Sequence, residues 1–460
     1  MWIVLGLLFL CSGIIYCYRE LKYIKMNNDI YIISYARLLY SCSCGFFGAI
    51  LCFLYAFQGI KLRLSTLVIM DYDNEAAINL LIFWLCGVIG YCSLCAGYSI
   101  VRNKKIVISR NSAIHRKVLS DRQVYIIAVM CFLIGLFGLI IWTSDMGGIS
   151  QYIILASAIR GDYYNVYGNT HMAFRQIAKI LLPATYMFFF LSIQHEKTKL
   201  LYRISFIVSL IFSVLYLLCN DGRLTTAMFF LILVVGKMRY GKNEGKDIKK
   251  QFIKLGILLL FAFILLAKLD DISYFIRNNS VKIKSPSEEY SIFETLMQEF
   301  TYIYKSGITA VANCFPNGRL LFIDDLLFGI SAYIPGNLGD YTHISLYNTI
   351  LCTHNTVNMA GAIPCDLIAY SLYALSYAGV IIIPMIVGMT VRFVENSFQG
   401  KKNNPLEQTL YAGAQLTAFR LMTYCEVYDF LTAIFAYLFL WLLAYLMSFI
   451  FRCRIGGMRK

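Results

Sequence analysis

The chain has 460 residues, of which 59% are hydrophobic and 15% charged, with a mean hydropathy of +0.64 and a formal net charge of +15. A water-soluble domain cannot cover that much apolar surface, so the composition excludes a soluble globular protein and indicates an integral membrane protein. The excess of Lys and Arg would also fit a nucleic-acid-binding protein. Its distribution between apolar segments favours membrane topology instead, and we expect no nucleic-acid partner.

About eleven apolar stretches are long enough to cross a bilayer, which takes roughly 20 residues per helix. They predict an all-α polytopic membrane protein, and we interpret residues 1–460 as a single integral membrane domain because no linker divides the chain. The expected helices lie near 1–18, 30–57, 78–101, 123–143, 174–193, 204–219, 224–237, 253–269, 366–391, 408–424 and 429–451.

Lys and Arg are unevenly distributed among the connections between these helices. Of the 41 Lys and Arg residues, 27 fall in connections that alternate with weakly charged ones. By the positive-inside rule the basic connections are cytoplasmic, which places the N-terminus outside and the C-terminus inside. The basic segments are Arg19 to Lys25, Arg102 to Arg122, Lys197 to Arg203, Lys237 to Lys254, Arg392 to Lys402 and Arg452 to Lys460.

The longest outward connection covers residues 270–365, and its sequence predicts a structured loop. Apolar residues recur at helical spacing through 290–312, which predicts a helix there. Residues 320–334 are too short and too interrupted to span the membrane, and they fit an interfacial segment that packs back on the helices. A large outward loop directs the search for a functional site to the outer face.

Most of the fifteen cysteines lie inside apolar stretches, where they behave as small hydrophobic residues. No paired CxxC motif or His-rich cluster occurs, so we expect no metal and no cofactor. The outer-side cysteines are Cys314, Cys352, Cys365 and Cys425, and one disulfide among them is an open alternative.

Arg175 and Lys179 stand four residues apart in a predicted membrane helix with no carboxylate beside them. Two like charges on one helix face are normally destabilising, so their presence needs an explanation. They either extend toward outer lipid headgroups or bind a polyanion, with a pyrophosphate as the obvious candidate.

Four further arginines lie on the outer side. Arg223 begins a helix after a tight turn, where backbone N–H groups attract anions, although Asp221 could neutralise it. Arg420 lies near Glu426 and Asp429, which are candidate ion-pair partners. The other two arginines are Arg160 and Arg319. Together with Arg175 and Lys179, the four arginines form the predicted cationic group.

A general base for hydroxyl chemistry would have to come from the same outer region. His354, in LCTHNTVNMAG, is one candidate because histidine titrates near neutral pH, and an ordinary surface histidine is the alternative. Asp324 and Asp325 in the large loop are the other candidates. The sequence shows no paired catalytic carboxylates, nucleophile elbow or nucleotide-binding glycine loop.

Four segments resemble the Wzy-type oligosaccharide repeat-unit polymerases of bacteria, which make O-antigen and capsular polysaccharide. They are MGGISQYIILASAIRGDYYNVYG (146–168), CNDGRLTTAMFFLILVV (219–235), IPCDLIAYSLYALSYAGVIIIPMIVGMTVR (363–392) and FRLMTYCEVYDFL (419–431). One departure is that the family's aromatic-Gly-x-x-Gly appears here as SYAGV, which lacks the first glycine. The segment THNTVNMAG also resembles part of the related O-antigen ligases.

This resemblance implies a glycosyltransferase bundle of the GT-C kind in the bacterial cytoplasmic membrane. The growing glycan on undecaprenyl diphosphate would be transferred, without a metal, to a hydroxyl of an incoming lipid-linked repeat unit. Donor and acceptor glycans, membrane lipids, a flippase and a chain-length regulator are the implied partners. The cations would hold the diphosphate, and His354, Asp324 or Asp325 would act as base. The alternatives are an O-antigen ligase and a flippase or other transporter.

We expect labelling from outside the cell to establish the orientation. In a cysteine-depleted background, Lys284→Cys should react with an impermeant thiol reagent because residues 270–365 are external. Lys246→Cys, in a cytoplasmic connection, should react only after the membrane is permeabilised. Labelling of the second variant but not of the first in intact cells would reverse the predicted topology.

Overall fold

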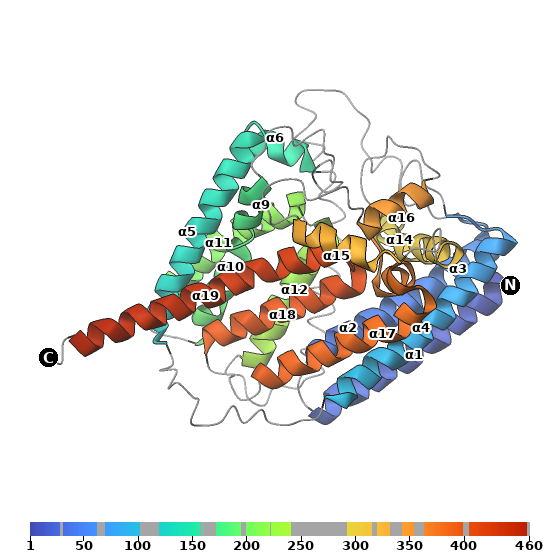
Figure 1. Ribbon diagram of the computed structural model, residues 1–460, viewed down its shortest axis with the longest axis horizontal. Coiled ribbons are helices and arrows are strands. Elements are labelled where there is room, and N and C mark those ends of the chain that lie inside the picture. Colours follow the sequence, from blue (N-terminus) through green and yellow to red (C-terminus); the bar gives the residue numbers. More distant parts are fainter. Residues whose placement is uncertain are drawn as a thin grey trace. The chain divides into compact units, whose positions relative to one another are not determined.

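The computed structural model is helical throughout the part of the chain that it describes (Figure 1). No strand occurs among those residues. The described residues are 1–27, 31–61, 70–101, 119–156, 159, 172–194, 199–220, 222–240, 292–314, 320–331, 343–353, 363–398 and 404–457.

The chain forms two compact units. Unit 1 comprises Met1–Asn103, Ala267–Glu395 and Thr417–Leu431, and unit 2 comprises Lys104–Leu266, Asn396–Leu416 and Thr432–Lys460. The chain passes from one unit to the other several times, so the units are not consecutive domains. The interpretation of one integral membrane domain stays a prediction.

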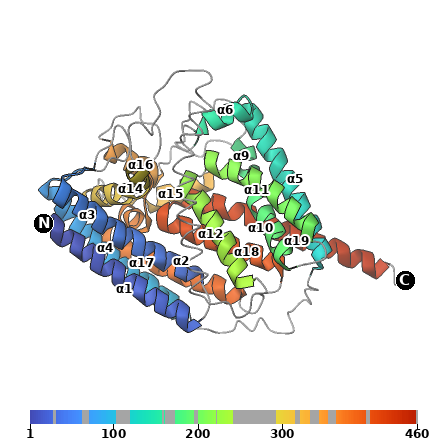
Figure 2. The ribbon, with the colours of Figure 1, turned by 180° about the vertical axis from the view of Figure 1, so that it is seen from behind.

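Unit 1 begins with helices that lie side by side in both views (Figures 1 and 2). Helix α1 packs against α2, η1 and α3, and its Gly13 carbonyl accepts a 2.7 Å hydrogen bond from Ser41. These elements are α1 (Trp2–Asn27), α2 (Ile32–Ser41), the π-helical turn η1 (Cys42–Phe46), α3 (Phe47–Gln58) and α4 (Asn74–Ile100).

The later part of unit 1 contains four further helices and parts of two others. Helix α14 packs against both α4 and α16. The helix predicted within 290–312 is present as α14, and residues 320–334 include a second short helix, α15. The elements are α14 (Ile292–Ala312), α15 (Phe322–Ser331), α16 (Ile344–Cys352) and α17 (Leu367–Phe398), with the end of α18 (Pro405–Thr423) and the start of α19 (Val427–Gly457).

Unit 2 is built around α10, which packs against α5, α11 and α12. Aromatic and aliphatic side chains from these helices form its core, in which Trp142, Tyr186 and Phe229 are fully buried. The elements are α5 (Asp121–Asp145), α6 (Ile149–Ile154), α9 (Met172–Ala178), α10 (Leu181–Gln194), α11 (Lys199–Asn220) and α12 (Gly222–Tyr240), with the remaining parts of α18 and α19.

Eight helices among the described residues are long and apolar enough to cross a membrane, which makes this a multi-pass membrane protein. Three of the eleven predicted spans are not among them. The apolar part of α12, Leu224–Lys237, is shorter, and residues 253–269 lie outside the described residues. Helix α18 is present but polar. None of its side chains is exposed, so protein rather than lipid surrounds it.

Helix α17 is broken in its first third. Ser376 has φ 55° and ψ −153°, and the preceding Leu375 is also non-helical. This backbone region is essentially reserved for glycine. Ser376 stands where the family pattern has its first glycine. Gly379, three residues later, leaves no room for a side chain, because a Cβ there would lie 2.0 Å from the Ser371 carbonyl oxygen.

Close backbone contact brings α4 and α17 together beyond this break. A Cβ on Gly97 would lie 2.0 Å from the Met385 carbonyl oxygen, and one on Gly388 would lie 2.2 Å from that of Leu94. Small residues at such crossings let membrane helices gain packing contacts that the hydrophobic effect does not supply in lipid.

We expect Ser376→Gly to raise the thermal unfolding midpoint of the purified protein in detergent. Glycine adopts this conformation without the strain of about 1–3 kcal/mol that another residue carries. Ala378→Gly, two residues later in the helical part of α17, is the matched control and should lower the midpoint. A lower midpoint for Ser376→Gly would contradict the strained conformation.

Candidate functional site

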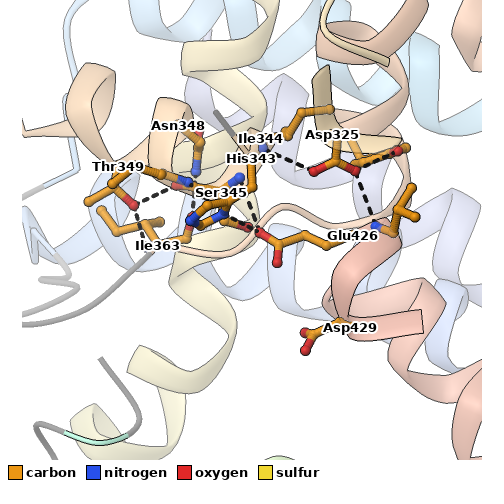
Figure 3. Close-up of polar contacts among 12 residues, drawn as sticks. Asp325, His343, Ile344, Ser345, Asn348, Thr349, Ile363, Glu426 and Asp429 are labelled. Atoms are coloured by element: carbon orange, nitrogen blue, oxygen red, sulfur yellow. Dashed lines mark hydrogen bonds and ion pairs between the residues drawn. The ribbon is translucent and has the colours of Figure 1, made fainter. Parts of the chain in front are cut away.

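Asp325 joins three helices of unit 1 through its buried carboxylate. Its Oδ1 accepts a 3.2 Å hydrogen bond from the Ile344 N–H, the first of α16. Its Oδ2 accepts hydrogen bonds from the Val427 N–H, the first of α19, at 3.1 Å and from the Tyr370 hydroxyl at 2.9 Å. One carboxylate therefore caps two helix N-termini and also holds α17 (Figure 3).

Glu426 and His343 cap the next two N–H groups of α16. Glu426 Oε1 accepts a 3.1 Å hydrogen bond from the Ser345 N–H. His343, the N-cap residue, receives the Leu346 N–H on Nδ1 at 3.3 Å. Its ring packs on Phe328 with the centroids 4.7 Å apart. The first three N–H groups of this helix thus meet side chains from three different segments.

The buried carboxyl groups around α16 are harder to ionise than carboxyl groups in water. Burial raises the pKa of Asp325, although its three hydrogen-bond donors oppose that effect. Burial raises the pKa of Glu426, His343 lowers it, and nearby Asp429 and Asp325 raise it, so that the net value is about 7. Burial also raises the pKa of Asp366, at the start of α17, to about 7.

Arg420 and Asp429 form an ion pair beside this group, with Nη2 and Oδ1 2.9 Å apart. The Arg420 side chain is buried, and the Asp429 side chain is 23% exposed. Of the two partners that the sequence offers Arg420, the structure therefore selects Asp429. Glu426 instead faces His343, with 3.4 Å between Oε1 and Nδ1.

A second set of hydrogen bonds fixes α16 from its other side. The Asn348 amide donates to Ser306 of α14 and to the Ile363 carbonyl, each at 2.9 Å, and its oxygen accepts from the Tyr373 hydroxyl at 3.0 Å. The Thr349 hydroxyl accepts the Ile363 N–H at 2.7 Å. These bonds hold the helix that presents His343 in one position.

The segments that carry the family resemblance meet in pairs. In unit 1, segments 363–392 and 419–431 are joined by the Cys425 N–H, which donates to the Cys365 carbonyl at 2.8 Å, and by the bridge through Asp325. In unit 2, the Asn220 amide of segment 219–235 donates to the Tyr152 hydroxyl of segment 146–168. Gly222, in the turn after Asn220, has φ 88°.

Lys179 and Arg175 do not share one regular helix face. Helix α9 ends at Ala178, and the Lys179 and Ile180 N–H groups bond back three residues, so a tight turn precedes α10. Lys179 is buried and donates to the Thr432 hydroxyl at 3.1 Å, whereas Arg175 is partly exposed. The prediction that the two charges stack on one helix face assumed that the helix is unbroken between them.

The remaining predicted residues are only partly described. Arg160, Arg319 and His354 lie outside the described residues, and Arg223 is placed only as part of α12. Of the described residues, Arg175, Lys179 and Arg223 belong to unit 2, whereas Arg420, Asp324 and Asp325 belong to unit 1. Asp324 is half-buried on α15. The predicted meeting of the cations at one diphosphate stays a prediction. Cys314, Cys352, Cys365 and Cys425, which the sequence predicts on the outer side, are free thiols in the structure.

The sequence contains His343 and Glu426 but gives little reason to pair them. They are 83 residues apart, and Glu426 looks like a partner for the nearby Arg420. The one available signal is that two of the five histidines lie in the large loop. The chain matches no protein-family model, no curated protein and no solved structure.

We expect Asp325→Asn to destabilise the protein by about 2–3 kcal/mol, because an amide nitrogen would then face hydrogen-bond donors in a buried position. The neighbouring Asp324→Asn should change stability by less than about 0.5 kcal/mol. Chemical unfolding of the purified proteins in detergent measures both. Equal effects would contradict the capping role of Asp325.

Proposed function

We propose that the protein polymerises undecaprenyl-diphosphate-linked oligosaccharide repeat units into O-antigen, capsular or exopolysaccharide. The reaction is a metal-independent glycosyl transfer at the outer face of the bacterial cytoplasmic membrane. The observation that carries this proposal is the meeting, in pairs, of the four segments that resemble the repeat-unit polymerases. In unit 1 an arginine, a histidine and several carboxyl groups lie together at that meeting.

The chemistry needs few protein groups because a diphosphate is already a good leaving group. Cations stabilise the charge that develops as the glycosidic bond to the diphosphate breaks, and a base assists the attacking hydroxyl. Arg160, Arg175, Lys179, Arg223, Arg319 and Arg420 are the cationic candidates. Asp325 fits the role of base poorly, because three donors occupy its two oxygens.

A transporter of lipid-linked oligosaccharide is the second candidate, and the break in α17 favours it. Transporters bind their cargo at interrupted membrane helices, where the ends of the half-helices face the ligand. In this chain the half-helix before the break ends near Tyr373. The Tyr373 carbonyl accepts a 3.4 Å hydrogen bond from the Leu321 N–H. A flippase and a polymerase differ in what accumulates when each is lost.

Deletion of the gene tests the proposal directly. We expect the ladder of surface glycan lengths to collapse to a single repeat unit, and the intact gene to restore the ladder. A flippase deletion would instead remove surface glycan and leave lipid-linked repeat units inside the cell. A ligase deletion would leave long chains on the lipid carrier, unattached to their final acceptor.

The cationic residues need a test that separates phosphate binding from ion pairing. Arg223→Ala and Arg420→Ala should abolish long chains at normal protein levels, and Arg420→Lys should recover little because lysine lacks the planar guanidinium. Asp429→Asn removes the partner of Arg420 but keeps the arginine, so it should retain long chains. If Asp429→Asn and Arg420→Ala have the same effect, Arg420 serves only the ion pair.

A further inference from the structure

The carboxyl groups of the unit 1 cluster differ in how they are held. Asp325 is engaged through both oxygens by three donors. Asp366 is the local cap of α17, where its Oδ1 accepts the Ala369 N–H at 3.0 Å. Asp429 is neutralised by Arg420. Each of these groups has a structural task that accounts for it.

Glu426 differs from these groups because a histidine lies beside the oxygen that caps α16. Oε1 meets both Ser345 and His343. Among the described residues, no hydrogen bond is made to Oε2. Figure 3 shows that oxygen pointing away from both Ser345 and His343. Glu426 is only 8% exposed, so its Oε2 lies at the edge of a largely buried cluster.

His343 is placed to share a proton with Glu426. Its Nδ1 lies 3.3 Å from the Leu346 nitrogen and 3.4 Å from Glu426 Oε1. It accepts the Leu346 N–H only when Nδ1 carries no proton, and it donates to Glu426 only when Nδ1 is protonated. These two arrangements differ by one proton and need no movement of the helix.

We propose that Glu426 removes the proton from the attacking hydroxyl of the acceptor glycan and that His343 shares it. This rests on the proposed function. The hydroxyl oxygen forms a bond to the anomeric carbon of the donor glycan. The bond from that carbon to the diphosphate oxygen breaks, and the lipid diphosphate leaves with the electron pair. The hydroxyl proton passes to Glu426 and then to water.

This role predicts that elongation requires the ionised form of Glu426. The rate should be highest above pH 7 and fall as the pH is lowered through about 7, where the carboxylate takes up a proton. Because His343 lowers the pKa of Glu426, His343→Asn should move the midpoint of this fall to higher pH while asparagine still caps α16.

The titratable or charged groups that face Glu426 are His343, Asp325, Asp429, Tyr370, Cys365 and Cys425.

The experiment uses the full-length protein in proteoliposomes, with lipid-linked repeat units extracted from the deletion strain as substrate. Glu426→Gln should lower the elongation rate by about 100-fold or more, because the amide oxygen still accepts the Ser345 N–H but takes up no proton. Asp366→Asn is the matched control. It also replaces a buried carboxyl group with a pKa of about 7, and it should retain both the rate and the pH profile because asparagine caps a helix well.

The outcomes separate this inference from the proposed function. If the wild-type protein elongates glycan and Glu426→Gln does so at a similar rate, Glu426 is not the base. If Glu426→Gln fails to accumulate, the wild-type pH profile and Glu426→Asp decide instead. A wild-type rate that does not change between pH 6 and pH 8, or a Glu426→Asp profile identical to the wild-type one, overturns the inference. Absence of any elongation by the wild-type protein would contradict the proposed function itself.

Discussion

The polar cluster of unit 1 depends on the need to satisfy the N–H groups at buried helix ends. In the absence of water an unpaired backbone N–H costs several kcal/mol. Unit 1 meets this requirement with carboxylates from distant parts of the chain. Asp325 caps α16 and α19, Glu426 caps α16, and Glu395 of α17 accepts the Ile33 N–H of α2 at 2.9 Å. Each of these bonds fixes one helix end against another segment.

The same bonds explain why so many acidic groups lie inside an apolar protein. A helix N-terminus carries a partial positive charge that stabilises a nearby carboxylate. Where the chain also supplies an arginine, the charge is compensated directly, as for Arg37 with Glu20 at 3.2 Å. Arg37 is itself buried against that carboxylate. Acidic residues that look isolated in the sequence therefore meet hydrogen-bond donors or an arginine in the fold.

The proposed chemistry depends on the few polar groups that are not used up in this way. Glu426 combines a capping bond through one oxygen with a second oxygen that points away from the cap. The turn between α18 and α19 positions it, and α16 brings His343 beside it. A rigid set of capping bonds thus holds a group that can exchange a proton, which is the arrangement that general-base chemistry requires.

The sequence alone determined the membrane class and most of the helices. Apolar runs and basic connections are local properties, so they can be recognised without knowing the fold. The tertiary structure decided which side chains meet. Glu426 pairs with His343 rather than with Arg420, and the spacing of Arg175 and Lys179 is interrupted by a turn. Contacts between residues far apart in the chain depend on helix packing, which no local pattern specifies. The same holds for α18, whose polar sequence is tolerated because protein and not lipid surrounds it.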